Sequence, residues 1–313
     1  MDRVPPLTGL LVLGAGGFAG GHFARAAREA GIDVVRAGHS ESLDLKVDLL
    51  DPDSIRRALT DCAPAAIANL AGASSVAASF RDPVAAFQAN ATGVLNLLDA
   101  AAELAPGAHV VCVSSGEVYG GVPDAELPFT EDQSAAPVSP YGASKAAMEA
   151  ICGAYERARG LRIAVIRAFN HTGPGQSDAF AASSFARQVA EAELRGAPEA
   201  ELRVGDLTLA RDFSDVRDIV RAYVEVVENE LTGTYNACSG RATRIGELVD
   251  HLGDAAELPV RATVEPERLR DGEAPILYGS PDRLREATGW STTTPLEATM
   301  RDLLDWWRDR VTK

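Results

Sequence analysis

The chain has 313 residues, of which 46% are hydrophobic and 24% are charged, and its formal net charge is −15. This composition is typical of a folded globular protein, and the negative charge argues against a protein that binds nucleic acid along the phosphate backbone. The four cysteines form no CxxC pair, so we expect neither a zinc site nor a disulfide framework.

Apolar runs alternate with amphipathic stretches through the first half of the chain. Strands are expected at 9–14, 33–38, 65–72, 109–115 and 162–170, and helices at 18–31, 52–62, 83–105 and 144–160. Alternation of this kind, with continuously apolar strands, indicates a parallel sheet covered on both faces. The sequence therefore predicts an α/β protein with a Rossmann-like, doubly wound parallel sheet.

The regular alternation of strands and helices ends after Asn170, where loops and short strands are mixed with helices. The segment "TGTYNACSG" is expected to return to the main sheet as a strand. We therefore divide the chain into a nucleotide-binding domain, residues 1–169 with 212–242 returning to it, and a substrate lobe, residues 170–211 and 243–313. The substrate lobe is smaller, C-terminal and non-contiguous.

A glycine-rich loop joins the first predicted strand to the first predicted helix. In "LVLGAGGFAGG", Gly14, Gly17 and Gly20 lie three apart. Without side chains, this backbone can turn sharply and approach a pyrophosphate, whose charge suits a helix amino terminus. The loop predicts dinucleotide binding, and tight strand–helix packing without a ligand is the alternative.

The end of the second predicted strand bears on the choice of cofactor. An acidic residue there would bind the adenosine ribose 2′-hydroxyl and favour NAD, but Gly38 stands at this position. Arg36 and His39 lie close by and would tolerate a 2′-phosphate, so we prefer NADP(H) over NAD(H). Solvent-facing side chains without a ligand are the alternative. Asp48 could accept a hydrogen bond from the adenine amino group.

Two side chains suited to proton transfer follow in "YGASK". Tyr141 and Lys145 lie four apart at the start of a helical stretch, so they share one face. An ammonium beside a phenol lowers the pKa of the phenol. Tyr141 could then exchange a proton with a carbonyl or alcohol while hydride moves to or from a nicotinamide. A surface pair that arose by chance is the alternative.

Six segments carry a family resemblance, in order, over essentially the whole chain. They are "GAGGFAG", "NLAG", "NATGVLNLLDA", "SSGEVYG", "YGASK" and "RAFNHTGPGQ". The chain resembles the extended short-chain dehydrogenase/reductases that act on nucleotide sugars. The resemblance implies that Ser115, rather than Ser114, is catalytic and that Tyr119 is structural. It further implies that Tyr141 is the acid/base and that Lys145 is its partner and a ligand of the cofactor ribose.

The resemblance also places an asparagine, Asn90, at a bend in a helix near the active site. Residues of the third strand end, in "NLAG", would let the cofactor backbone pass. The full set of expected cofactor-binding residues is Gly14, Gly17, Phe18, Gly20, Arg36, His39, Asp48, Leu49, Leu70, Ala71, Gly72, Asn90, Tyr141 and Lys145.

Further stretches are similar to GDP-4-dehydro-6-deoxy-D-mannose reductases, among them "RDFSDVRDIVRAY" and "TGWSTTTPLEATMRDLLDWWR". This similarity implies reduction of the C4 ketone of a GDP-linked 6-deoxyhexose, giving GDP-D-rhamnose. It implies substrate contacts from Asn170, Arg211 and Arg270, since guanidinium groups suit phosphates. For Arg211 an ion pair with a neighbouring aspartate is the alternative. Arg187 is a further candidate, although a solvent-facing helix position explains it more simply.

Glu117 leaves the reaction type open. Sugar-nucleotide 4,6-dehydratases of this family have a catalytic glutamate two residues after the serine or threonine, and Glu117 stands there. A carboxylate at this place can instead bind sugar hydroxyls in a ketone reductase, which we favour. Dehydration, with Glu117 as the base, and epimerisation are the enzymatic alternatives. A non-catalytic dinucleotide-binding protein is the alternative from another class.

The expected surroundings of the protein follow from its apolar segments. The helices predicted at 83–105 and 144–160 are long and apolar, which fits a homodimer contact, although burial within one subunit is the alternative. No stretch approaches the length of a membrane span, and the amino-terminal apolar run is too short for a signal peptide. We therefore expect a cytoplasmic protein without a membrane partner.

Overall fold

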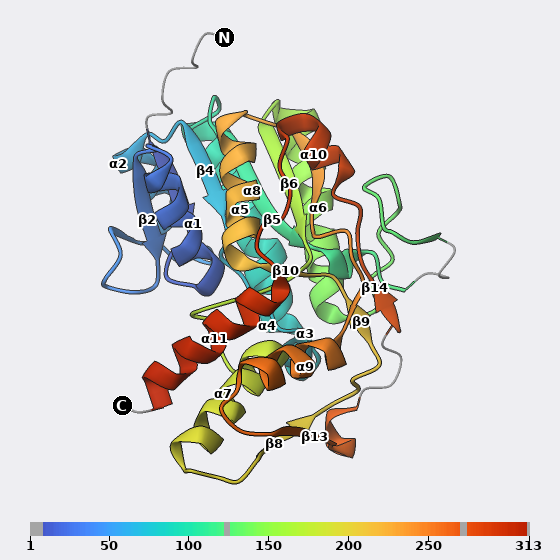
Figure 1. Ribbon diagram of the computed structural model, residues 1–313. Coiled ribbons are helices and arrows are strands. Elements are labelled where there is room, and N and C mark those ends of the chain that lie inside the picture. Colours follow the sequence, from blue (N-terminus) through green and yellow to red (C-terminus); the bar gives the residue numbers. More distant parts are fainter. Residues whose placement is uncertain (1–8, 122–125, 270–273, 312–313) are drawn as a thin grey trace.

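A seven-stranded sheet forms the centre of the computed structural model, which describes residues 9–121, 126–269 and 274–311 (Figure 1). In spatial order the strands are β11 (Gly233–Ala237), β6 (Arg162–Ala168), β5 (His109–Ser115), β4 (Ala66–Asn69), β1 (Leu10–Leu13), β2 (Val34–Gly38) and β3 (Leu45–Lys46). Every neighbouring pair is parallel. The predicted Rossmann-like, doubly wound α/β fold is therefore confirmed.

Helices cover both faces of the sheet because strand side chains alternate between them. On β1, Leu10 belongs to the core beneath one pair of helices, and Leu11 belongs to the core beneath the others. The first face carries α1 (Phe18–Glu29) and α8 (Val216–Glu228), and the second carries α2 (Pro52–Cys62), α5 (Gly93–Leu104) and α6 (Pro140–Arg159). Tyr223 of α8 and Met148 of α6 are fully buried in these two cores.

The connection between β4 and α5 is irregular. It contains α3 (Val76–Arg81), α4 (Pro83–Phe87) and a π-helical turn, η1 (Gln88–Thr92), so the helix expected over 83–105 is not uniform. The wider turn places an extra residue in the helix, and it carries Asn90. After β5, the 3₁₀ turn η2 (Gly116–Val118) leads away from the sheet.

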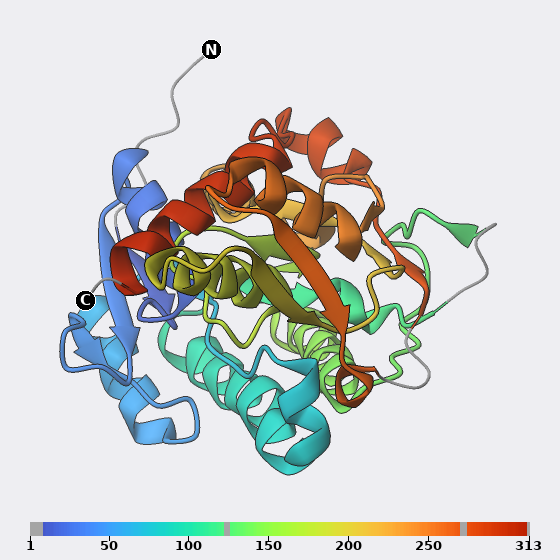
Figure 2. The same ribbon diagram turned by 60° about the horizontal axis from the view of Figure 1, so that its bottom comes forward.

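Residues of the predicted substrate lobe build a second core. The helices α7 (Ala181–Leu194), α9 (Ile245–Ala255) and α11 (Leu296–Val311) pack against the parallel strands β8 (Ala200–Val204) and β13 (Val260–Val264). Figures 1 and 2 both show these elements gathered together beside one end of the sheet.

One short pairing joins the predicted lobe to the segment that returns to the sheet, between β7 (Asn170–Thr172) and β10 (Phe213–Asp215). Three further short strands pair within the predicted lobe: β9 (Ala210–Arg211) with β12 (Thr243–Arg244) and with β14 (Ile276–Leu277). The remaining helical elements are η4 (Pro266–Arg268) and α10 (Asp282–Thr288).

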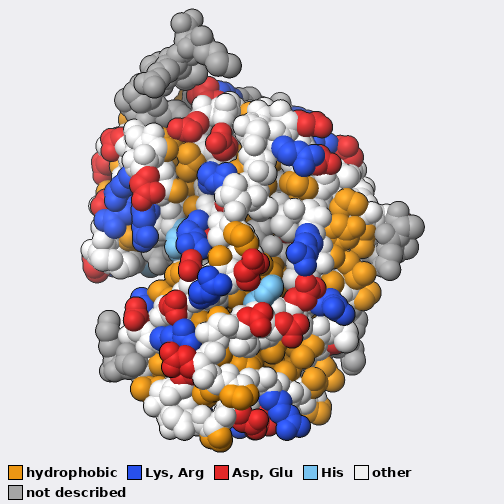
Figure 3. Space-filling view, in the orientation of Figure 1, with side chains coloured by type: hydrophobic (Ala, Val, Ile, Leu, Met, Phe, Trp, Pro, Cys, Tyr) orange, Lys and Arg blue, Asp and Glu red, His pale blue; other side chains and the backbone are white. Residues whose placement is uncertain are grey.

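The surface is mixed in charge. On the face shown in Figure 3, Lys and Arg side chains alternate with Asp and Glu, so the described residues of this face form no continuous basic surface. No described helix has both the length and the apolar character needed to cross a lipid bilayer. Within the same residues, no cluster of three or more His, Cys, Asp or Glu side chains could hold a metal ion.

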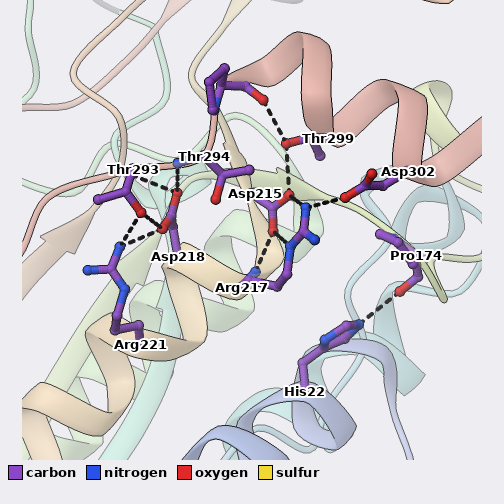
Figure 4. Close-up of polar contacts among 11 residues, drawn as sticks. His22, Pro174, Asp215, Arg217, Asp218, Arg221, Thr293, Thr294, Thr299 and Asp302 are labelled. Carbon is purple, nitrogen blue, oxygen red and sulfur yellow. Dashed lines mark hydrogen bonds and ion pairs between the residues drawn. The ribbon is translucent and has the colours of Figure 1, made fainter. Parts of the chain in front are cut away.

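A buried carboxylate ties α8 to α11 (Figure 4). Asp215 caps α8 by accepting from the backbone nitrogen of Arg217 at 2.7 Å. The same carboxylate accepts from Nε and Nη2 of Arg217 at 2.8 and 2.7 Å, and from Oγ1 of Thr299 on α11 at 2.8 Å. The Asp215 carboxylate therefore accepts hydrogen bonds from both α8 and α11.

Replacement of this carboxylate should destabilise the protein. Asp215→Ala removes a helix cap and leaves the buried Thr299 hydroxyl with a poorer set of partners, so we expect a loss of about 2–4 kcal/mol in the free energy of unfolding. Asp302→Ala is the control, because Asp302 also pairs with Nη2 of Arg217 but its side chain is 41% exposed; it should cost under about 1 kcal/mol. Denaturant titration measures both, and equal losses would contradict the role given to Asp215.

Candidate active site

A cleft of about 510 Å³ opens where the carboxyl ends of β1, β4, β5 and β6 meet the lobe. This is the place where open α/β sheets bind ligands. Most of the predicted site residues lie together in its lining, although they come from distant parts of the chain: Gly14, Gly17, Phe18, Gly20, Leu70, Gly72, Ser115, Glu117, Tyr141, Lys145, Asn170 and Arg211.

The glycine loop brings bare backbone to one end of the cleft. Gly14 has a φ of +80°, and a Cβ added there would lie 2.6 Å from the backbone nitrogen of Ala71. A Cβ on Gly20 would collide with the carbonyl oxygen of Gly14, so both positions exclude side chains. The helix α1 begins directly after Gly17 and has no acidic residue in its first turn. Its positive amino end fits the diphosphate of a dinucleotide.

The segment after β4 contains a further glycine, Gly72, that has no room for a side chain. A Cβ on Gly72 would collide with Oδ1 of Asn90, which lies behind the cleft and is 1% exposed. Nδ2 of Asn90 donates to Oγ of Ser144 at 2.8 Å, whereas its Oδ1 has no hydrogen-bond partner among the described residues. Ala71 is held by Oδ1 of Asn69, which accepts from its backbone nitrogen. Asn90 and Ala71 therefore support the lining without belonging to it.

The three expected catalytic side chains meet in the middle of the cleft. Ser115 ends β5, and its hydroxyl lies close enough to the Tyr141 phenol to lower the pKa of the phenol. The Ser115 hydroxyl also accepts from the backbone nitrogen of Glu117 at 3.2 Å. Tyr141 and Lys145 lie one helical turn apart on α6, and Nζ of Lys145 donates to the carbonyl oxygen of Val113 at 2.8 Å. Tyr141, Ser115 and Lys145 are all buried.

Burial, rather than Lys145, dominates the pKa of Tyr141. Burial raises the pKa of Tyr141 to about 12, and the charge of Glu117 raises it further, while the hydrogen bond to Ser115 opposes this shift. Burial also lowers the pKa of Lys145 to about 8. Because removal from water outweighs the other influences on both groups, the phenol keeps its proton at neutral pH.

The hydroxyls of Ser114 and Tyr119 bind partners outside the Tyr141 contact. Oγ of Ser114 donates to Oε1 of Glu149 at 2.5 Å, within a buried ion pair between Glu149 and Arg167. The Tyr119 hydroxyl donates to Oδ1 of Asn236 at 2.7 Å, and its ring is buried in an aromatic stack. In the segment "SSGEVYG", Ser115 is thus the hydroxyl that reaches Tyr141.

Several residues expected to bind the cofactor do not line the cleft. Arg36 forms a two-point ion pair with Asp44, from Nη2 to Oδ1 at 2.8 Å and from Nε to Oδ2 at 3.1 Å. His39 is exposed beyond the end of β2. Oδ1 of Asp48 accepts from the backbone nitrogen of Leu50, and Leu49 is buried against α5. A cofactor role for Arg36, His39, Asp48 and Leu49 stays a prediction.

The expected substrate residues divide in a similar way. Asn170 begins β7, and Arg211 ends β9, where its Nη1 donates to the carbonyl oxygen of Ala210 at 2.8 Å. Both line the cleft. Arg187 lies elsewhere, on α7, and forms ion pairs with Asp178 and Glu191. Arg270 lies outside the described residues.

The sequence did not reveal the apolar wall of the cleft. Its members are non-polar side chains of α3, of the N-cap of α7, of the residue before β9, of β10, of the start of α9 and of β14: Val76, Phe80, Phe180, Leu209, Phe213, Ile245 and Leu277. Such residues carry no motif, and the folding of the lobe onto the sheet alone brings them together. The one feature that could have indicated this wall was the position of residues 76–81 shortly after the strand β4.

Comparison with known proteins agrees with this arrangement. The model of the GDP-mannose 4,6 dehydratase family matches residues 11–303. The chain is 37% identical over 307 residues to a GDP-6-deoxy-D-mannose reductase from Pseudomonas aeruginosa, covering 96% of this chain and 98% of that protein. It is 28% identical over 329 residues to a UDP-glucose 4-epimerase from Rhizobium meliloti, covering 95% and 96%.

Solved structures show the same relationship. The structure of RMD from Pseudomonas aeruginosa complexed with NADPH matches with a TM-score of 0.86 at 35% identity, over 97% of this chain and 99% of that chain. A UDP-glucose 4-epimerase from Thermus thermophilus in complex with NAD matches with a TM-score of 0.83 at 28% identity, over 96% and 98%. The chain therefore belongs to the GDP-mannose 4,6-dehydratase family of the extended short-chain dehydrogenase/reductases.

Proposed function

We propose that this protein is a nucleotide-sugar reductase that uses NAD(P)H. Its substrate is the C4 ketone of a nucleotide-linked 4-keto-6-deoxyhexose, and the reaction we favour converts GDP-4-dehydro-6-deoxy-D-mannose to GDP-D-rhamnose. The likeness to the Pseudomonas aeruginosa reductase over almost the whole of both chains supports this choice. The UDP-glucose epimerases are less similar.

The observation that carries the proposal is the convergence of Ser115, Tyr141 and Lys145 in the cleft that the glycine loop also lines. Ketone reduction needs a proton donor at the carbonyl oxygen, and a phenol that is protonated at neutral pH can serve as that donor. Dehydratases and epimerases of this family use the same group in the opposite direction when they begin by oxidising C4. The choice of the reductase among them therefore rests on the likeness to the Pseudomonas aeruginosa reductase over almost the whole of both chains.

The described residues have defined tasks in this reaction. The glycine loop and α1 hold the cofactor diphosphate, and Lys145 holds its ribose. The nicotinamide, when bound, supplies the hydride that reaches C4. Tyr141 donates its proton to the C4 oxygen, so that hydride and proton together convert C=O to CH–OH. Ser115 donates a hydrogen bond to the same oxygen as negative charge develops there.

The remaining assignments complete the proposal. Asn170 and Arg211 bind the sugar diphosphate, and the nucleotide lies in the substrate lobe formed by residues 170–211 and 243–313. NADP(H) is the preferred cofactor, because the end of β2 has no carboxylate at Gly38. NADPH is bound in the Pseudomonas aeruginosa structure, and NAD in the Thermus thermophilus one. A cytoplasmic location stays a prediction.

Removing the Tyr141 hydroxyl should stop turnover. With GDP-4-keto-6-deoxymannose and NADPH, Tyr141→Phe should lower kcat by about 10²–10⁴-fold, because proton donation is lost. Binding of NADPH, followed by fluorescence, should persist. Tyr119→Phe is the matched control, because its hydroxyl meets Asn236 rather than the cleft, and its kcat should change by less than about threefold. A Tyr141→Phe enzyme with a near-normal rate would contradict the assignment.

One observation favours a second function, 4,6-dehydration. Glu117 lines the cleft close to Tyr141, at the position where the family's dehydratases have their base. The same carboxylate can accept hydrogen bonds from sugar hydroxyls in a reductase. The two functions differ in their need for reductant, because dehydration regenerates its own cofactor.

Glu117→Gln distinguishes the two functions. In a reductase, the variant should raise KM for the keto sugar about tenfold with a smaller change in kcat, because an amide accepts fewer hydrogen bonds. Wild-type protein given GDP-mannose without added reductant should form no 4-keto sugar, as judged by NMR. If wild-type protein forms a 4-keto sugar and the Glu117→Gln variant forms none, the protein is a dehydratase.

We also propose that the protein is a homodimer. The helices α4 and α5 carry large apolar side chains that are about half exposed: Val84, Phe87 and Leu95. Figure 2 shows α4 and α5, in cyan, beside α6, in green, so a second copy could pack its own helices against this face.

Charges placed on this face should separate the two copies. We expect wild-type protein to have twice the monomer mass of 32.9 kDa in light scattering, and Val84→Glu/Phe87→Glu to have the monomer mass. Leu194→Glu is the control, because Leu194 is equally exposed on α7 of the lobe, and it should leave the dimer intact. A wild-type protein with the monomer mass would contradict the dimer proposal.

A further inference from the structure

The first turn of α6 presents backbone donors that its own helix cannot satisfy. Pro140 has no N–H, and the N–H of Gly142 donates to Oγ of the capping Ser139 at 3.0 Å. The N–H of Tyr141 is thereby left without a partner in its own helix. It donates to Oγ of Ser79 at 3.0 Å, a residue 62 positions earlier in the chain.

Ser79 is committed to this contact. It lies on α3, is 2% exposed, and its Oγ donates to the carbonyl oxygen of Val76 at 2.7 Å. With its proton used there, the hydroxyl oxygen is free to accept from Tyr141. The neighbouring residues Val76 and Phe80 belong to the apolar wall of the cleft. One hydroxyl therefore fixes that wall relative to Tyr141.

The carbonyl side of Tyr141 is held from the same connection. Its oxygen accepts from Oγ of Ser144 at 2.7 Å, and Oγ of Ser144 accepts in turn from Nδ2 of Asn90 at 2.8 Å. Both Ser79 and Asn90 come from the irregular connection between β4 and α5. This connection thus holds the backbone of Tyr141 at two points.

We propose that Ser79 is a positioning residue for the proton donor Tyr141. By accepting from the Tyr141 N–H, it sets the position of the phenol relative to α3, whose residues Val76 and Phe80 line the cleft. The inference rests on the proposed role of Tyr141 in reduction. Loss of the bond should act on kcat, because small misplacements of reacting groups slow the chemical step. Affinity for NADPH should change little, because α1 and the glycine loop are untouched.

A purely structural role would give a different result, and Thr288 provides the comparison. Oγ1 of Thr288 donates to the carbonyl oxygen of Leu284 at 2.9 Å and accepts from the backbone nitrogen of Trp290 at 3.1 Å, the same bonding pattern as Ser79. Thr288 ends α10, whose residues do not line the cleft. Loss of the Thr288 hydroxyl should lower the free energy of unfolding without changing kcat of the folded enzyme.

The test compares Ser79→Ala, Ser79→Thr and Thr288→Ala. We expect kcat to fall about ten- to a hundredfold in Ser79→Ala, with KM for NADPH within about twofold of wild type. Ser79→Thr should stay within about threefold of wild type, because its hydroxyl can make the same bonds. Thr288→Ala should keep the wild-type kcat. Hydrogen exchange at the Tyr141 amide should be faster in Ser79→Ala only.

Two results would overturn the inference: a wild-type kcat in Ser79→Ala, or an equal loss of kcat in Ser79→Ala and Thr288→Ala. If Ser79→Ala does not fold, Ser79→Cys keeps the shape and weakens the acceptor, and its kcat should be intermediate. A wild-type protein without reductase activity contradicts the proposed function instead. The exchange measurement needs no substrate, so wild-type protection of Tyr141 in Ser79→Ala would still refute the Ser79 contact.

Discussion

Burial of the Tyr141 phenol against the Ser115 hydroxyl is the interaction on which the site depends. The phenol lies where β5 and α6 meet the cleft, and removal from water raises its pKa to about 12. A group in this state holds a proton at neutral pH and can release it only to an oxygen that is becoming negative. Such a group can serve as the proton donor that the proposed reduction needs.

The fold and part of the site were predictable because they rest on local rules. Continuous apolar strands gave the parallel sheet, and the close approaches at Gly14 and Gly20 follow from a turn that side chains would block. The pKa of Tyr141 was expected to fall beside Lys145, but burial raises it, and spacing along a helix says nothing of burial. Arg36 was expected near the cofactor, but its ion pair with Asp44 depends on a loop whose course the sequence does not specify.

The segment between β4 and α5 shows what lies beyond sequence patterns. The helix expected over 83–105 is divided into α4, a π-helical turn and α5, and the helix α3 before it was not expected. This path of the chain brings Ser79 to the N–H of Tyr141 and Asn90 to Ser144, contacts that span more than 50 residues. A local pattern cannot encode such a pairing, so the residues that position the proton donor emerge only from the assembled fold.

The central claim is that hydride reaches C4 of the sugar while Tyr141 protonates its oxygen. Deuterium tracing tests it most directly, with GDP-4-keto-6-deoxymannose and NADPH that carries deuterium on C4 of its nicotinamide. Proton and deuterium NMR of the product should show one deuterium at C4 of a 6-deoxyhexose, with one NADPH consumed for each sugar. A product without deuterium at C4, or a sugar converted without consuming NADPH, would contradict the account.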